Sequence, residues 1–140
     1  MPAKPSANPP ADSVSILLAE DNAVNQRLAQ RMIEKMGHSV IVVDNGRKAV
    51  EAALRQTFDL ILMDLQMPEM DGFEATACIR DAENQPQGEA RRHTPIVAVT
   101  AHAMAGDREQ CLRSGMDHYI SKPINFEALR ALVDQCVGKG

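Results

Sequence analysis

Apolar and polar positions alternate along this chain with a spacing that changes repeatedly between that of a strand and that of a helix. Short apolar runs typical of buried strands lie at residues 14–19, 39–43, 59–63, 95–99 and 118–120. A segment with helical spacing follows each run, at residues 22–36, 46–55, 71–82, about 103–114 and 125–137. Strands that alternate with helices in this way are predicted to lie parallel and to be joined by right-handed crossovers.

Two of the helical segments carry positions that suggest which face packs on the sheet. In the first segment, one face carries an apolar stripe of Val24, Leu28, Met32 and Met36. In the third segment, Phe73, Ala77 and Arg80 recur at helical spacing and so share one face. We expect these positions to lie on the inward faces of the two helices.

Five strand–helix units are too few for an eight-stranded barrel and predict an open sheet. The expected fold is α/β and flavodoxin-like, a doubly wound five-stranded parallel sheet in the order 2-1-3-4-5 with helices on both faces. Residues 14–138 are expected to form this single domain. Residues 1–13 are rich in proline, alanine and serine without periodicity, which predicts a disordered linker or tail.

The ends of the expected strands carry the polar residues that indicate a site. Ligands of such sheets bind beyond the carboxyl ends of the strands where the strand order reverses, which here lies between strands 1 and 3. Strand 1 runs into Glu20 and Asp21, and the very apolar strand 3 runs into Asp64. Strands 4 and 5 run into Thr100 and Lys122. We therefore expect these side chains to meet at one edge of the sheet.

This set of residue types favours phosphoryl chemistry. Three neighbouring carboxylates cannot all stay ionised without a cation, and an all-oxygen cluster suits Mg²⁺. A hydroxyl and a lysine can neutralise phosphoryl oxygens while a carboxylate attacks in line. Asp64 is the best candidate nucleophile because its strand is central. Each residue alone has a simpler explanation: each acid could be a solvated residue at a strand end, Lys122 a surface lysine and Thr100 a helix cap. The interpretation as a phosphoryl site therefore depends on their joint placement.

Composition narrows the class of protein further. The chain has 140 residues and a net charge of −4, which argues against direct binding of nucleic acid. Cys78, Cys111 and Cys136 are widely spaced, which fits free, buried thiols in a reducing cytosol rather than disulfides or a metal site. No apolar run is long enough to cross a bilayer, and the N-terminus lacks the apolar stretch of a signal peptide.

From Ser15 to about Val137 the chain resembles the receiver domains of two-component response regulators. The residues that carry the resemblance are 18–22 (LAEDN), 64–72 (DLQMPEMDG), 99–101 (VTA) and 122–123 (KP). The resemblance implies that Asp64 is the phosphoacceptor. It also implies that Asp21, Asp64 and the backbone carbonyl of Gln66 bind Mg²⁺, with Glu20 acting through water. Thr100 and Lys122 would contact the phosphoryl group, and the Lys122–Pro123 peptide bond would be cis.

The same resemblance assigns roles to three further residues. Tyr119 takes the place of an aromatic residue that acts with Thr100 as a switch, although an amphipathic residue with a wet hydroxyl explains it equally well. Gln66 and His102 occupy positions that tune hydrolysis of the aspartyl phosphate. For His102, a plain loop histidine is the alternative.

Residues 21–26 resemble receivers that are fused to hybrid sensor histidine kinases, although Asn25 in this run could simply solvate an exposed helix face. The implied partners are a histidine kinase or a histidine phosphotransfer domain that docks near the first helix. The tail then fits an interdomain linker. The expected location is the cytoplasm, including the cytoplasmic part of a membrane-bound sensor kinase. Catalysis would be limited to self-catalysed aspartyl phosphorylation and dephosphorylation, while the parent of a hybrid chain would be a kinase.

Three other functions remain open from sequence. A stand-alone response regulator would share the site but not the hybrid context. A phosphatase of the haloacid dehalogenase kind would need a second acid two residues after its nucleophile, where this chain has Gln66. An inert interaction module would have no use for the intact acids and Lys122.

Overall fold

The computed structural model describes residues 14–84, 93–101 and 105–137. The strands are β1 (Ser15–Ala19), β2 (Ser39–Val43), β3 (Leu60–Asp64), β4 (Ile96–Thr100) and β5 (His118–Ser121). The helices are α1 (Ala23–Lys35), α2 (Gly46–Arg55), α3 (Gly72–Glu83), α4 (Ala105–Arg113) and α5 (Phe126–Val137). The expected tail, most of the loop after α3 and His102 lie outside the described residues.

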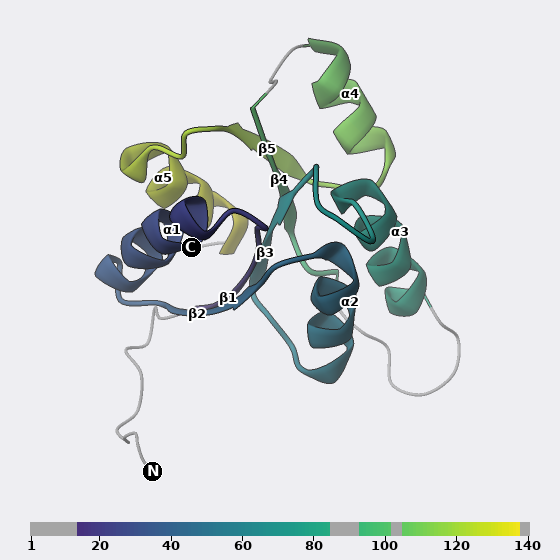
Figure 1. The fold of residues 1–140 in the computed structure, drawn as a ribbon, viewed down its shortest axis with the longest axis horizontal. Coiled ribbons are helices and arrows are strands. Elements are labelled where there is room, and N and C mark those ends of the chain that lie inside the picture. The colour runs from purple at the N-terminus through teal and green to yellow at the C-terminus, as the bar shows by residue number, and fades with distance from the viewer. Residues whose placement is uncertain (1–13, 85–92, 102–104, 138–140) are drawn as a thin grey trace.

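All described strands pair in parallel in the order β2-β1-β3-β4-β5, which confirms the predicted doubly wound sheet. Helices α1 and α5 cover one face of the sheet, and α2, α3 and α4 lie on the other (Figure 1). Alternate strand residues therefore feed two separate cores. Leu18 and Leu62 pack towards α1 and α5, whereas Leu17 and Met63 pack towards the other three helices. The central strands are buried on both faces, as their continuous apolar runs predict.

Strand ends differ from the sequence-based bounds by one residue at two places that matter. Asp64 and Thr100 are the last residues of β3 and β4 instead of the first residues beyond them. Backbone pairing continues past both positions, since the Leu65 N–H donates to Val99 O and the Lys122 N–H to Thr100 O, at 3.2 and 2.8 Å. The site residues are thereby attached to the hydrogen-bonded sheet.

The predicted inward face of α1 is only half right. Ala29 and Ile33 are the buried residues of this helix, while Val24 and Leu28 are 61% and 49% exposed. Residues spaced by four advance about 40° around a helix at each step, so a four-residue stripe winds away from a flat sheet. Its last two members still pack on the core, but its first two face solvent.

The inward face predicted for α3 is right for Phe73, which packs against the core, and for Arg80, whose side chain is 13% exposed, but not for Ala77. Its buried residues include Ala75, Thr76 and Ile79, whereas Ala77 is exposed. The helix begins at Gly72, where a capping box of Asp71 and Glu74 satisfies backbone N–H groups at its start. Small residues on the buried face allow α3 to approach the sheet closely.

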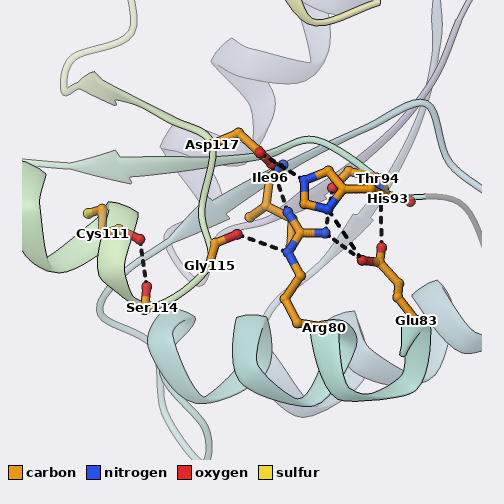
Figure 2. Close-up of polar contacts among 9 residues, drawn as sticks. All are labelled: Arg80, Glu83, His93, Thr94, Ile96, Cys111, Ser114, Gly115 and Asp117. Carbon is orange, nitrogen blue, oxygen red and sulfur yellow. Dashed lines mark hydrogen bonds and ion pairs between the residues drawn. The ribbon is translucent and has the colours of Figure 1, made fainter. Parts of the chain in front are cut away.

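Arg80 lies in a polar cluster at the amino ends of β4 and β5 (Figure 2). Its guanidinium donates to the carboxylates of Glu83 and Asp117 at 2.7 Å each, and to the carbonyl oxygens of Thr94 and Gly115 at 2.8 and 2.9 Å. His93 closes the cluster with a 2.8 Å contact between its Nε2 and Asp117. This cluster joins α3, the start of β4 and the turn before β5, at the sheet edge opposite to the carboxyl ends of the strands.

The cysteines divide into three environments. Cys111 is buried and Cys136 is half-buried, as predicted for core thiols, but Cys78 is exposed on α3. Burial, helped by the charge of Asp117, raises the pKa of the Cys136 thiol to about 11. Within the described ranges, no helix has the length and apolar character needed to cross a membrane.

Candidate active site

Three acids converge at the carboxyl edge of the sheet. Glu20 and Asp21 follow β1, Asp64 ends its neighbour β3, and one carboxylate oxygen from each lies within 4.8 Å of the others. Glu20 and Asp64 are buried, with 2% and 3% of their surface exposed, whereas Asp21 is exposed. The strand order brings these acids together, as the sequence predicts.

Lys122 supplies the one cation of the site among the described residues. Its Nζ lies 2.9 Å from Asp64 Oδ2 and 3.3 Å from Glu20 Oε1. The backbone that carries it is held by the Lys122 N–H bond to Thr100 O, and the following bond to Pro123 is cis, as predicted. Lys122 therefore joins β5 to both buried acids.

Burial and charge shift the pKa values of this cluster in a consistent way. Burial raises the pKa of Glu20 above its usual 4.5; the Asn22 N–H lowers it, and nearby Asp64 raises it again. Burial lowers the pKa of Lys122, but its hydrogen bond with Asp64 and the charges of both acids outweigh burial and raise it above 10.5. An acid whose pKa is raised by folding destabilises the fold above its unfolded pKa, so a cation that offsets the charge of Glu20 should stabilise the fold.

Backbone N–H groups hold the carboxylates of Glu20 and Asp64 in place. The Asn22 N–H donates to Glu20 Oε2 at 3.1 Å, and the Asn22 side chain caps α1 by accepting from the Asn25 N–H. The Gln66 N–H donates to Asp64 Oδ1 at 3.1 Å. Each buried carboxylate thus has one oxygen on a backbone N–H and the other beside Lys122.

The loop from β3 to α3, which contains Gln66, is held in place by close backbone approaches. The Gly46 N–H of α2 donates to Met70 O at 3.0 Å, and a Cβ on Gly46 would lie 2.2 Å from that oxygen. A Cβ on Gly72 would lie 2.4 Å from Asp64 O. Between them, Glu69 has a φ of 67°, which is rare for a residue other than glycine. A side chain at Gly46 or Gly72 would collide with these backbone oxygens, so both positions require glycine.

Thr100 and Tyr119 lie on the neighbouring strands β4 and β5. Thr100 is buried at the end of β4, directly opposite Ser121 in the parallel register with β5. Tyr119 is half-buried two residues earlier on β5 and packs on the core beneath α2, α3 and α4. Phosphoryl contact by Thr100 and switching by Tyr119 stay predictions, as does hydrolysis tuning by Gln66 and His102.

The donor set fits a magnesium ion. Its donor atoms are carboxylate oxygens, which hard divalent cations prefer, and Asp21 leaves the cluster open to solvent. Three carboxylates beside one ammonium leave two excess negative charges when all four groups are ionised, which a divalent cation would balance.

Sequence reasoning missed two residues that hold this site. Gln26 binds the carbonyl oxygen of Glu20, and Gly46 binds the β3–α3 loop. Gln26 falls in the 21–26 run that resembles hybrid receivers, so its position was noticeable although its contact was not. For Gly46, the only signal is an Asn-Gly pair at the start of a helix.

The chain belongs to the response regulator receiver domain family. The family model for the response regulator receiver domain matches residues 16–134, which is most of the chain and includes every residue of the site.

Histidine kinases are among the curated relatives of this chain. The chain is 44% identical over 123 residues to the sensor histidine kinase GacS of Pseudomonas protegens. This alignment covers 88% of this chain and 13% of that protein. It is 36% identical over 157 residues to the probable histidine kinase 1 of Oryza sativa subsp. indica, covering 94% of this chain and 16% of that protein. The chain therefore spans less than a fifth of the length of these relatives.

Solved structures agree in fold. The receiver domain of sensor histidine kinase PA1611 from Pseudomonas aeruginosa, with magnesium coordinated in its active-site cleft, is 41% identical with a TM-score of 0.79, covering 90% of this chain and 98% of that one. A Saccharomyces cerevisiae complex of the phosphotransfer protein Ypd1 with the receiver domain of Ssk1 gives 33% identity and a TM-score of 0.82, covering 88% of each chain.

Proposed function

We propose that residues 14–138 form a phosphoacceptor domain that takes a phosphoryl group from phosphohistidine onto Asp64. The observation that carries this proposal is the placement of a buried Asp64 between Lys122, at 2.9 Å, and two further acids that suit Mg²⁺. An oxygen of Asp64 attacks phosphorus, the bond from phosphorus to the donor imidazole breaks, and the imidazole nitrogen takes up a proton. Lys122 and Thr100 bind the transferred phosphoryl oxygens, and Tyr119 responds with Thr100.

Asp21, Asp64 and the Gln66 carbonyl would hold Mg²⁺, with Glu20 acting through water. The ion supplies neutralisation of phosphoryl charge when bound. The magnesium-containing receiver domain of PA1611 supports this assignment. Gln66 and His102 are proposed to set the rate at which the aspartyl phosphate hydrolyses.

The function predicts that the protein phosphorylates itself from a small phosphodonor. Incubation of the wild-type protein with phosphoramidate and Mg²⁺ should add one phosphoryl group, which intact-mass spectrometry would detect. Removal of Mg²⁺ with EDTA should suppress the reaction strongly, because the phosphoryl charge and the site acids would then repel each other. Equal uptake with and without Mg²⁺ would contradict the metal assignment.

We further propose that the chain is the receiver of a hybrid sensor histidine kinase and that residues 1–13 are a linker to it. The histidine kinases among its relatives support this context. A stand-alone response regulator is the alternative. A phosphatase of the haloacid dehalogenase kind is not favoured, because it would need a second acid where this chain has Gln66. The free thiols support a cytoplasmic location.

The partner is proposed to be a histidine phosphotransfer domain that docks on α1 beside the site. Exposed Leu28 lines a pocket together with Pro123 and Ile124, and with Glu20 and Lys122 of the site. Val24, one turn earlier on α1, is also exposed. An apolar surface that reaches the phosphorylation site is suited to a partner that must bring its histidine there. The Ypd1 complex of the Ssk1 receiver supports this kind of partner.

Leu28→Glu is expected to lower phosphotransfer from purified histidine phosphotransfer domains by about ten-fold or more, because a charge would be desolvated in the interface. Phosphorylation by phosphoramidate should be unchanged. Leu54→Glu is the matched control, since Leu54 is 43% exposed on α2 and is absent from the pocket lining. Equal losses in the two variants would contradict docking on α1.

A further inference from the structure

A glutamine side chain on α1 holds the backbone that carries two of the site acids. Gln26 Nε2 donates to the carbonyl oxygen of Glu20 at 2.6 Å. The backbone N–H of the same residue donates to Asn22 O at 2.9 Å. Gln26 therefore binds both ends of the turn that contains Asp21.

The Glu20 carbonyl belongs to the peptide that leads directly to Asp21. On the other side of Glu20, its N–H donates to Val43 O of β2 at 3.0 Å. Because a peptide group is planar, holding this oxygen sets the direction in which the chain leaves β1. That direction decides where the Asp21 carboxylate lies relative to Asp64.

The contact is partly buried and cannot be replaced freely by water. Glu20 has 2% of its surface exposed, and Gln26 is half-buried. A buried carbonyl that loses its donor costs more than a surface hydrogen bond is worth. The loop is expected to shift its backbone when this donor is removed.

The same helix contains a natural comparison. Gln30 lies one turn further along α1, and its Nε2 contacts Glu34 Oε2 at 3.3 Å on the exposed surface. It holds no loop and lies further from the acids. The two glutamines have the same helix propensity and differ in what their amides bind.

We infer that Gln26 is a positioning residue for the magnesium site, acting on Asp21 through the Glu20–Asp21 peptide. This inference rests on the proposed function, because it assigns Gln26 a part in the same site. Groups that orient metal ligands typically affect metal affinity by ten-fold or more when removed.

Gln26→Met removes the donor while keeping side-chain length and helix propensity. Titration of Mg²⁺, followed by calorimetry, should show about ten-fold weaker binding than in the wild type. Gln30→Met should bind Mg²⁺ like the wild type. The rate of phosphoramidate-driven phosphorylation at saturating Mg²⁺ should change less than the half-saturating Mg²⁺ concentration does, because Gln26 does not contact the reacting atoms.

A second measurement needs no metal. In the metal-free protein, the carbonyl carbon resonance of Glu20 and the amide resonance of Asp21 should shift in Gln26→Met and stay in place in Gln30→Met. Unshifted resonances with wild-type Mg²⁺ affinity would overturn the inference. Equally weakened Mg²⁺ binding in both variants would show that the effect comes from helix stability, and would also overturn the inference. Failure of the wild type itself to bind Mg²⁺ would instead refute the proposed function.

Discussion

Replacing Asp64 with asparagine is expected to abolish phosphoryl uptake, lowering it by at least roughly 1,000-fold, because an amide is a very poor nucleophile. The change is nearly isosteric, so the buried position at the end of β3 should be kept. It also removes one of the three clustered carboxylates, and Mg²⁺ binding should weaken. Intact-mass spectrometry with phosphoramidate and calorimetric titration with Mg²⁺ measure the two effects separately.

Asp71→Asn is the matched control for this variant. Asp71 lies in the loop that follows Asp64 and caps α3 by accepting from the Glu74 N–H at 2.9 Å. Asparagine caps helices as well as aspartate does, so this variant should fold and take up phosphate like the wild type. Continued phosphorylation of Asp64→Asn at the wild-type rate would show that another residue accepts the phosphoryl group.

The site could be predicted from sequence because strand ends in a parallel sheet are few and meet at one edge. Once the strands were recognised, topology alone placed Glu20 and Asp21 beside Asp64, and the structure confirms that placement. Lys122 was also predictable, since the end of β5 can lie only at the same edge. The residues of the site are far apart in the sequence, but the order of the strands, which the apolar pattern predicts, already places them together.

The contacts that hold the site could not be predicted in the same way. Gln26 binds a carbonyl oxygen six residues away, and which of several polar helix residues does so depends on the exact rotation of α1. The same rotation decides that Ala29 is buried and Leu28 is exposed. Apolar pattern determines helix rotation only within a few tens of degrees, which is too coarse to assign single hydrogen bonds.

Arg80 shows the same limit more strongly. In the sequence it is one more residue in step with an apolar stripe, whereas in the structure only 13% of its side chain is exposed. Two of its partners, Thr94 and Gly115, contribute backbone carbonyl oxygens, which leave no trace in a sequence. Asp117 could have suggested an ion pair, but it lies 37 residues away.

Arg80→Met is expected to lower the free energy of unfolding by about 3 kcal/mol, since removing one partner of a largely buried ion pair leaves the others uncompensated. Glu83 would keep a buried carboxylate with 8% side-chain exposure, and two carbonyl oxygens would lose their donor. Arg80→Lys should recover less than half of this loss, because an ammonium cannot reproduce the planar fork that serves four acceptors. Urea denaturation followed by circular dichroism measures both values.

Arg113→Met is the control that separates this cluster from ordinary surface pairing. Arg113 lies 3.5 Å from Glu109 across one helical turn, and both side chains are more than 70% exposed. Such a pair contributes at most about 0.5 kcal/mol, so this variant should unfold like the wild type. Because the cluster lies at the sheet edge opposite to Asp64, Arg80→Met should retain wild-type Mg²⁺ affinity at temperatures where it is folded. A loss below about 1 kcal/mol would place Arg80 among surface ion pairs and remove its role in joining α3 to β4 and β5.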